Sequence, residues 1–276
     1  MNKLTVDKRS QVVSALVEGN SIRATVRMTG VAKNTIVKLL AGLGKVTADF
    51  QDKTLRNLPC KRIQCDEIWS FCYAKDKNVP EEKRHIFGYG DVWTWVAIDA
   101  DTKLVASFTV GSRSSQTAKL FIDDLAERLA NRVQLTTDGH RAYLQAIEDA
   151  FGANIDYAML IKLYGSDSEP EKRYSPAECI GTREVGVTGR PDPRHISTSF
   201  VERQNLTMRM SMRRFTRLTN AFSKKVDNHY WAIALHYMHY NFCRIHQTLR
   251  VTPAMEAGIA NHVWSIEELV RLMDSN

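Results

Sequence analysis

The spacing of the apolar residues changes near residue 60. Before that point, apolar side chains recur at helical spacing in three short runs, at Val12–Val17, Ile22–Val26 and Ile36–Leu40. Beyond it, apolar and polar residues alternate in part over 62–74, and 92–100 is rich in residues typical of strands. The chain is therefore predicted to fold as a small all-α module followed by a larger α/β domain.

Residues 1–45 show the pattern of a helix-turn-helix domain. Chain-breaking segments, EGNS at 18–21 and TGVA at 29–32, separate the three helical runs, and Ser21 can cap the second helix. In such a module the third helix, here about 33–43, enters the major groove. Its early residues would then meet bases or phosphates: Lys33, Asn34, Thr35 and Lys38. A small helical packing domain with a solvated lysine face is the alternative.

Residues 46–60 lack clear periodicity and are predicted to be a linker to a domain over 61–225. Within that domain the expected strands are 62–74, 92–100, 104–111, 132–139 and 156–165, and the expected helices are 115–130 and 141–152. Three antiparallel strands followed by β-α units predict a mixed sheet flanked by helices. Residues 164–197 are polar and rich in Pro and Gly, which favours a long inserted loop, and 226–276 is expected to be a C-terminal helical region.

Positive charge is concentrated in two segments. The net charge is +7 and the isoelectric point is about 9.1, yet residues 1–58 alone hold ten Lys or Arg against four Asp or Glu. Residues 203–226 hold seven Lys or Arg and no acid. Two separate basic surfaces predict a polyanionic partner, most commonly nucleic acid. No apolar run is long enough to cross a membrane and no export signal is present, so we expect a cytoplasmic protein without a membrane partner.

The cysteine pattern argues against a disulfide scaffold or a zinc site. The five cysteines are Cys60, Cys65, Cys72, Cys179 and Cys243, an odd number without regular spacing or a C-x-x-C pair. We expect them to be reduced and mostly buried.

One acid stands at the head of the second basic segment. If 199–217 forms a helix, Glu202, Asn205, Arg209 and Arg213 share one face, while a second face collects Val201, Met208, Met212, Phe215 and Leu218 and is predicted to be buried. Glu202 could simply pair with a nearby arginine, which contributes only a few tenths of a kcal/mol on an exposed helix. The functional alternative is that Glu202 belongs to a metal-binding cluster whose arginines hold phosphates.

Two further acids lie where the predicted sheet would bring them to such a cluster. Asp66 lies within a largely apolar strand, where a carboxylate is costly without a compensating cation or donor. Asp138 ends a strand, and ligands bind beyond the strand ends of open α/β sheets. Carboxylates with substrate phosphate are the ligands that Mg²⁺ prefers, and two such ions assist in-line phosphoryl displacement. Mg²⁺, or Mn²⁺ in its place, is therefore the expected cofactor.

Other titratable residues have simpler interpretations. Asp99 and Asp101 fit a hairpin turn, and Glu67 should point to the opposite side of its strand from Asp66. His140 could contact substrate or cap a turn. The three remaining histidines of interest lie among Tyr and Trp in a helical run, which favours packing over metal binding: His229, His236 and His239.

Several motifs resemble one known family. QCDEIW, TTDGHRAYL and SFVERQNLTMRM occur in this order after a helix-turn-helix, as in bacterial insertion-sequence transposases of the insertion-sequence-one type. These belong to the DDE group, with a retroviral-integrase-like (RNase H-like) core, and the similarity covers roughly residues 60–260. It implies a metal-binding triad of Asp66, Asp138 and Glu202, with Asn205 and Arg209 supporting or binding the DNA end. Some members carry a cysteine-rich zinc finger before the helix-turn-helix, and this sequence shows none.

The resemblance implies a DNA transposase. Such an enzyme binds the terminal repeats of its element, hydrolyses a phosphodiester and transfers the freed 3′-hydroxyl into target DNA, as a homodimer or a larger homo-oligomer. Arg213 and its neighbours would neutralise backbone phosphate. Two alternatives stay open: an RNase H-like nuclease without strand transfer, and a non-catalytic helix-turn-helix regulator that binds DNA.

Overall fold

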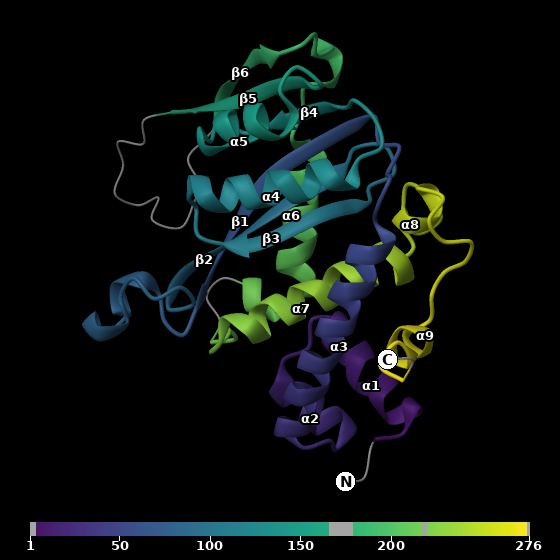
Figure 1. Ribbon diagram of the computed structural model, residues 1–276. Helices are drawn as coiled ribbons and strands as arrows, with labels where there is room; N and C mark the ends of the chain where they lie inside the picture. Colours follow the sequence, from purple (N-terminus) through teal and green to yellow (C-terminus); the bar gives the residue numbers. More distant parts are fainter. Residues whose placement is uncertain (1–3, 166–178, 217–219, 275–276) are drawn as a thin grey trace.

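The computed structural model describes residues 4–165, 179–216 and 220–274 of the chain (Figure 1). The helices are α1 Val6–Val17, α2 Ile22–Thr29, α3 Lys33–Thr54, α4 Ser115–Arg128, α5 Ala142–Phe151, α6 Ser199–Ser211, α7 Val226–Met238, α8 Pro253–Glu256 and α9 Ile266–Arg271. The strands are β1 Arg62–Cys72, β2 Gly90–Asp99, β3 Val105–Gly111, β4 Gln134–Thr137, β5 Asp156–Tyr164 and β6 Cys179–Thr188. Three helices thus precede an α/β domain, as expected.

The centre of the molecule is one mixed sheet with the strand order β3-β2-β1-β4-β5-β6. β1 pairs antiparallel with β2 and parallel with β4, and β4 pairs parallel with β5. Helix α4 connects β3 to β4 and α5 connects β4 to β5, so the two parallel pairs have the helical crossovers that parallel strands need. This arrangement confirms the predicted α/β fold class, a mixed sheet flanked by helices.

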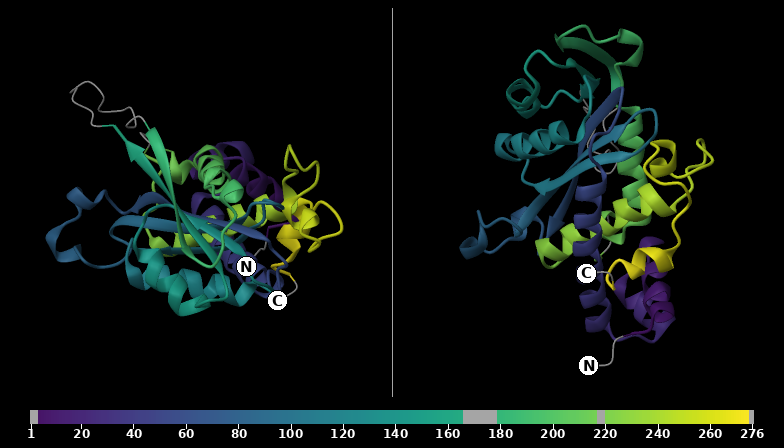
Figure 2. Two further views of the ribbon diagram at one scale, coloured as in Figure 1. Left: turned by 90° about the horizontal axis from the view of Figure 1, so that it is seen from above. Right: turned by 45° about the vertical axis from the view of Figure 1, so that its right-hand side comes forward.

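Helices cover both faces of the sheet. Figure 1 shows α4 in front of it and α6 behind it, and Figure 2 shows the same layers from two other directions. Trp95 on β2 is fully buried on the side of α4 and α5. Its ring centre lies 6.0 Å from that of Phe121 and 5.3 Å from that of Tyr143. Aromatic side chains of this size contribute much of the burial that stabilises a core.

Helix α2 begins and ends as its sequence predicts. The Ser21 side chain accepts a hydrogen bond from the backbone N–H of Ala24 at the start of α2. Gly30, with a φ of 70°, adopts the left-handed conformation that ends α2, which an L side chain would disfavour. These two residues fix the turns on either side of α2, below the sheet in Figure 1.

The expected linker over 46–60 is wrong in its first half, because α3 continues without interruption to Thr54. The buried face of this part of α3 includes the polar residues Thr47 and Gln51, so the spacing of apolar residues does not reveal the helix. The Gln51 amide donates to the carbonyl of Ala234 on α7. A Cβ at Gly44 would lie 2.4 Å from Trp231. The glycine therefore lets α3 cross closely over α7, joining the N-terminal helices to the α/β domain.

The expected loop over 164–197 contains a sixth strand, β6, which pairs antiparallel with β5. Residues 166–178 of this insertion lie outside the described part of the chain. Every residue of β6 is at least partly exposed, as suits an edge strand. The sequence shows no apolar alternation there because neither face of β6 is buried in the core.

The helix expected over 199–217 is shorter than predicted. It ends at Ser211, and Arg213–Phe215 forms a 3₁₀ turn, so Arg213 lies beyond α6 rather than on its face. The Thr216 hydroxyl donates to the carbonyl of Arg209, a partner that the end of a helix otherwise lacks. The apolar face is buried as predicted at Val201, Met208, Met212 and Phe215, whereas Leu218 lies outside the described residues.

The C-terminal region is helical in part. α7 leads into a π-helical turn, His239–Cys243, and the short helices α8 and α9 follow. α9 lies against α1, where buried Arg9 forms an ion pair of 2.7 Å with Asp274. All five cysteines are free, three of them buried: Cys60, Cys65 and Cys72. None of the helices in the described residues combines the length and the apolar character needed to span a membrane.

Candidate active site

The register of the central strands brings Asp66 beside Asp138. β1 and β4 run parallel, and Cys65 pairs with Thr137 in the last step of their register. The next residue along each strand is Asp66 and Asp138, respectively, so their carboxylates meet where β4 ends. The Asp138 side chain also accepts a hydrogen bond from the backbone N–H of His140 at 2.9 Å, which holds the turn that follows β4.

Gln64 positions the third acid. Its side chain is buried on β1, and its Oε1 accepts hydrogen bonds from the backbone N–H groups of Phe200 and Val201, at 2.8 and 3.2 Å. These N–H groups belong to the first turn of α6, where a helix has no partners of its own for them. Gln64 thus ties the start of α6 to β1, two residues before Asp66, and places Glu202 over the same part of the sheet.

All three predicted acids line one pocket of about 650 Å³. Its lining residues are Asp66, Arg113, Asp138, Gly139, His140, Arg141, Leu160, Ile161, Lys162, Tyr164 and Glu202. The sequence separates Asp66 from Glu202 by more than a hundred residues, and the fold brings them to one cavity.

Glu202 has two partners in the pocket. Its Oε2 lies 2.5 Å from Nζ of Lys162 on β5, and its Oε1 accepts a hydrogen bond from the Thr198 hydroxyl. This ion pair replaces the pairing with an arginine of its own helix that the sequence offered as the simpler interpretation. Lys162 therefore brings positive charge to the carboxylates, a role that was not predicted from the sequence.

Asn205 lies one turn after Glu202 and contacts the first acid directly. Its Nδ2 donates to Oδ2 of Asp66 at 2.9 Å, and the residue is 4% exposed. Asn205 therefore orients a carboxylate from within the protein instead of facing the solvent. Among the described residues its Oδ1 has no hydrogen-bond partner although it is buried.

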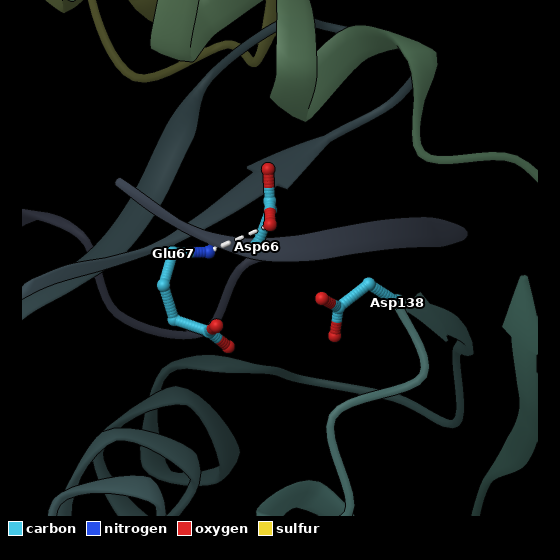
Figure 3. A group of neighbouring side chains, drawn as sticks. All are labelled: Asp66, Glu67 and Asp138. Atoms are coloured by element: carbon cyan, nitrogen blue, oxygen red, sulfur yellow. Dashed lines mark hydrogen bonds between the residues drawn. The ribbon is translucent and has the colours of Figure 1, made fainter. Parts of the chain in front are cut away.

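Glu67 is a fourth acid of the site, although its position next to Asp66 predicted that it would point to the other side of the strand. As expected, the Glu67 and Asp66 side chains leave β1 in opposite directions. The Asp138 side chain points toward both of them from the neighbouring segment (Figure 3). One oxygen each of Asp66, Glu67 and Asp138 nevertheless lie within 4.8 Å of one another. The adjacent Asp and Glu of QCDEIW could have indicated this role. The neighbouring strand β4 is short, and beyond its end side chains from opposite faces of β1 can approach each other.

Two of the crowded carboxylates, those of Asp66 and Glu67, resist ionisation. Burial raises the pKa of Asp66 to about 7, and the charges of Asp138 and Glu202 add to the effect. Burial and the charge of Asp138 likewise raise the pKa of Glu67 to about 7. Both shifts mean that the protein lacks enough positive charge to compensate these acids fully.

This donor set fits a divalent cation. The cluster offers carboxylate oxygens, the ligands of Mg²⁺, and a bound cation would offset the burial and the repulsion that together raise the pKa of Asp66. Among the described residues, buried Oε1 of Glu67 also has no hydrogen-bond partner. Asp66 and Asp138 of this cluster could hold the ion, with Glu202, which lines the same pocket but is not one of the three clustered acids, as a further ligand.

The other candidates of the sequence lie elsewhere. Lys33, Asn34, Thr35 and Lys38 are all exposed at the start of α3, a helix that contributes no residue to the lining of the pocket. Asp99 caps its turn as expected, accepting from the N–H of Asp101 and the hydroxyl of Thr102.

The histidines of the helical run are packing residues, as predicted. Burial lowers the pKa of His229 and of His236 to about 3 and that of His239 to about 4. His229 contacts the hydroxyls of Ser70 and Ser223 through its two ring nitrogens. His140 lines the pocket, and burial together with the charge of Arg113 lowers its pKa.

Neither a protein-family model nor a curated protein matches the sequence. Among solved structures, a cryo-EM structure of a piggyBac transposase synaptic complex with hairpin DNA is similar over 99% of this chain and 71% of that chain, at 12% identity and a TM-score of 0.41. A crystal structure of the Mos1 strand transfer complex is similar over 86% of this chain and 76% of that chain, at 10% identity and a TM-score of 0.25. Both TM-scores are below 0.5, so the function must be inferred from the pocket itself.

Proposed function

We propose that this chain is a DNA transposase of the DDE group, which binds the ends of its element and catalyses phosphodiester hydrolysis and strand transfer. The observation that carries the proposal is that Asp66, Asp138 and Glu202, from β1, the end of β4 and α6, line a single pocket with Lys162 and Arg113. Three acids with basic neighbours suit a reaction on a phosphodiester, which needs both a metal-binding set and phosphate contacts.

The residues of the pocket divide the work between them. Bound Mg²⁺ would supply Lewis-acid stabilisation of the attacking and leaving oxygens. Asn205 and Gln64 hold Asp66 and α6 in place, which limits the reorganisation needed during the reaction. Lys162 neutralises Glu202 before DNA arrives, and it is then placed to contact phosphate. Water and a 3′-hydroxyl can each be the attacking nucleophile, so one pocket serves both hydrolysis and strand transfer.

DNA recognition is assigned to the N-terminal helices. The exposed start of α3 carries two lysines, an asparagine and a threonine, side chains that contact phosphates and base edges in the major groove. Because α3 is continuous to Thr54 and crosses α7, a DNA end held there has a fixed direction relative to the pocket. Two ends must be joined, so we propose a homodimer or larger homo-oligomer acting on terminal repeats and target DNA.

Labelled duplexes cut from the DNA that flanks the coding sequence provide the test. Purified protein is incubated with them and Mg²⁺ or Mn²⁺, and cleaved and joined products are scored separately. Wild type should yield both, Glu202→Gln should yield neither, and Glu127→Gln, an exposed acid on α4 outside the pocket, should behave as wild type. Cleavage without joining would support a nuclease instead. Binding without any product, unchanged by Glu202→Gln, would indicate a non-catalytic regulator.

A further inference from the structure

Arg113 lies on a rigid turn between β3 and α4. The preceding residue Ser112 offers its carbonyl to the indole N–H of buried Trp95, and the following residue Ser114 caps α4 by accepting from the N–H of Thr117. A Cβ at Gly111 would lie 2.4 Å from Thr117, so the turn and the first turn of α4 are in close contact. The backbone of Arg113 is therefore fixed on both sides.

The side chain of Arg113 is held by two contacts. Its Nε donates to Oε2 of Glu67 at 3.2 Å, and its guanidinium carbon lies 4.8 Å from the ring centre of Trp93 on β2. The Glu67 side chain is 1% exposed, whereas that of Arg113 is 41% exposed. Glu67 thus lies behind the arginine, and Arg113 lines the pocket whereas Glu67 does not.

Most donors of Arg113 remain uncommitted. A guanidinium has five N–H donors, and among the described residues its hydrogen bonds use only Nε. Nη2 is 3.7 Å from Oδ2 of Asp138, within reach of charge attraction but beyond a normal hydrogen bond. The outer edge of the guanidinium therefore stands at the acidic cluster with donors available for an anion.

A purely structural ion pair explains this arrangement poorly. Taking the Glu67 carboxylate out of water costs much of what its attraction to Arg113 contributes to stability, and a neutral side chain would be easier to bury there. The Glu67 carboxylate holds Nε of Arg113, and the Trp93 ring packs against the flat face of the guanidinium. Together these two contacts fix the plane of the guanidinium. The two Nη groups can then form the paired hydrogen bonds that arginine makes with a phosphate.

We propose that Arg113 binds a backbone phosphate next to the scissile phosphodiester and that buried Glu67 is its positioning residue. The proposal rests on the proposed function, because it assigns the DNA strand to the pocket of Asp66, Asp138 and Glu202. The ligand of the part of the pocket lined by Arg113 is then a DNA phosphate. Glu67 contributes indirectly, by holding Arg113 in position.

The first test measures binding without chemistry. Wild type and Arg113→Ala, both in a Glu202→Gln background, are compared for the salt dependence of their affinity for the same duplex. Loss of one phosphate contact should lower the log–log slope by about one unit. Lys119→Ala removes an exposed lysine of α4 that is already paired with Asp123, and it should leave the slope unchanged. An unchanged slope for Arg113→Ala would overturn the proposal.

The second test removes the charge of single phosphates. Duplexes carry one neutral methylphosphonate at successive positions around the cleavage site, and cleavage rates are measured for wild type, Arg113→Ala and Arg113→Lys. On unmodified DNA, Arg113→Ala should be slower by about 100-fold, with Arg113→Lys between it and wild type. At one position only, the neutral phosphate should slow wild type and leave Arg113→Ala unaffected. Equal slowing of both proteins at every position would contradict the phosphate contact.

Glu67 has its own test. Glu67→Leu should slow cleavage and lose its sensitivity to the same methylphosphonate, whereas Glu67→Gln, which can still accept from Nε, should retain part of that sensitivity. The Mg²⁺ concentration for half-maximal rate should stay the same in both. A large rise in that concentration would make Glu67 a metal ligand and overturn its positioning role. If wild type cleaves no DNA but the slope test succeeds, the proposed function fails while the phosphate contact of Arg113 stands.

Discussion

Asn205 on α6 donates a hydrogen bond of 2.9 Å to Asp66 on β1 from a position 139 residues further along the chain. The same helix carries Glu202 one turn earlier, so a single rigid element both supplies one acid and orients another. This relationship links the shape of the pocket to the docking of α6 on the sheet. Asn205, which was expected to support or bind the DNA end, thus contacts an acid of the pocket from within the protein.

Asn205→Ala should therefore impair chemistry more than DNA binding. Loss of the hydrogen bond frees the Asp66 carboxylate to rotate, and removing such a supporting contact typically costs about 10–100-fold in activity or metal affinity. Single-turnover cleavage and duplex affinity, measured on the same preparation, provide the comparison. A loss of affinity equal to the loss of rate would indicate that Asn205 contacts DNA instead.

The metal-free protein should lose stability as the pH rises from about 4 to about 7. Asp66 and Glu67 both have folded-state pKa values of about 7, against 3.8 and 4.5 for the free side chains. Between these values the folded state binds more protons than the unfolded state, so the free energy of unfolding falls with rising pH. Urea unfolding in EDTA at about pH 5 and about pH 8 measures this difference.

Asp66→Asn and Mg²⁺ provide the controls for that experiment. The variant should be more stable than wild type at the higher pH, because it removes a charge from the cluster, and its pH dependence should be smaller. Mg²⁺ should raise the stability of wild type at the higher pH and do little for the variant. A wild-type protein indifferent to Mg²⁺ would argue against a cation in this cluster.

Gly44→Val should destabilise the junction of the N-terminal helices with the α/β domain. The added Cβ would lie 2.4 Å from the Cβ and the carbonyl oxygen of Trp231, so α3 and α7 must move apart. Overpacking of this kind costs about 1–3 kcal/mol or more. On the same helix, the Cβ of Gly42→Ala would meet only the flexible end of Met273 at 3.0 Å, and better helix propensity should make it neutral or stabilising. Thermal unfolding of both variants tests the contrast.

Exposed residues at the start of α3 should divide into two functional kinds. Lys33→Ala and Lys38→Ala should weaken binding to all duplexes alike and each lower the salt slope by about one unit. Asn34→Ala should mainly reduce the preference for the element end over unrelated DNA. Lys53→Ala, on the same helix but paired with Asp49 at 2.8 Å, serves as the control. If it weakens binding as much as Lys38→Ala, the contacts are not confined to the start of the helix.

The sequence predicted the elements with strong local signals and missed those without them. Ser21 and Gly30 mark the ends of α2 in the sequence and do so in the structure. The second half of α3 was missed because Thr47 and Gln51 occupy its buried face. The Gln51 amide is satisfied by donating to the carbonyl of Thr47 in its own helix and to that of Ala234 on α7. β6 was missed because an exposed edge strand needs no apolar pattern.

Residue types and their order along the chain identified Asp66, Asp138 and Glu202 as candidates, because an acid in an apolar strand, an acid at a strand end and an acid among arginines are each unusual by themselves. The partners that give these acids their chemistry were decided only by the tertiary structure: Gln64 at α6, Lys162 at Glu202, and Glu67 behind Arg113. These contacts depend on strand register and helix docking, which are set by packing across the whole core. Local sequence carries no record of the distances between them.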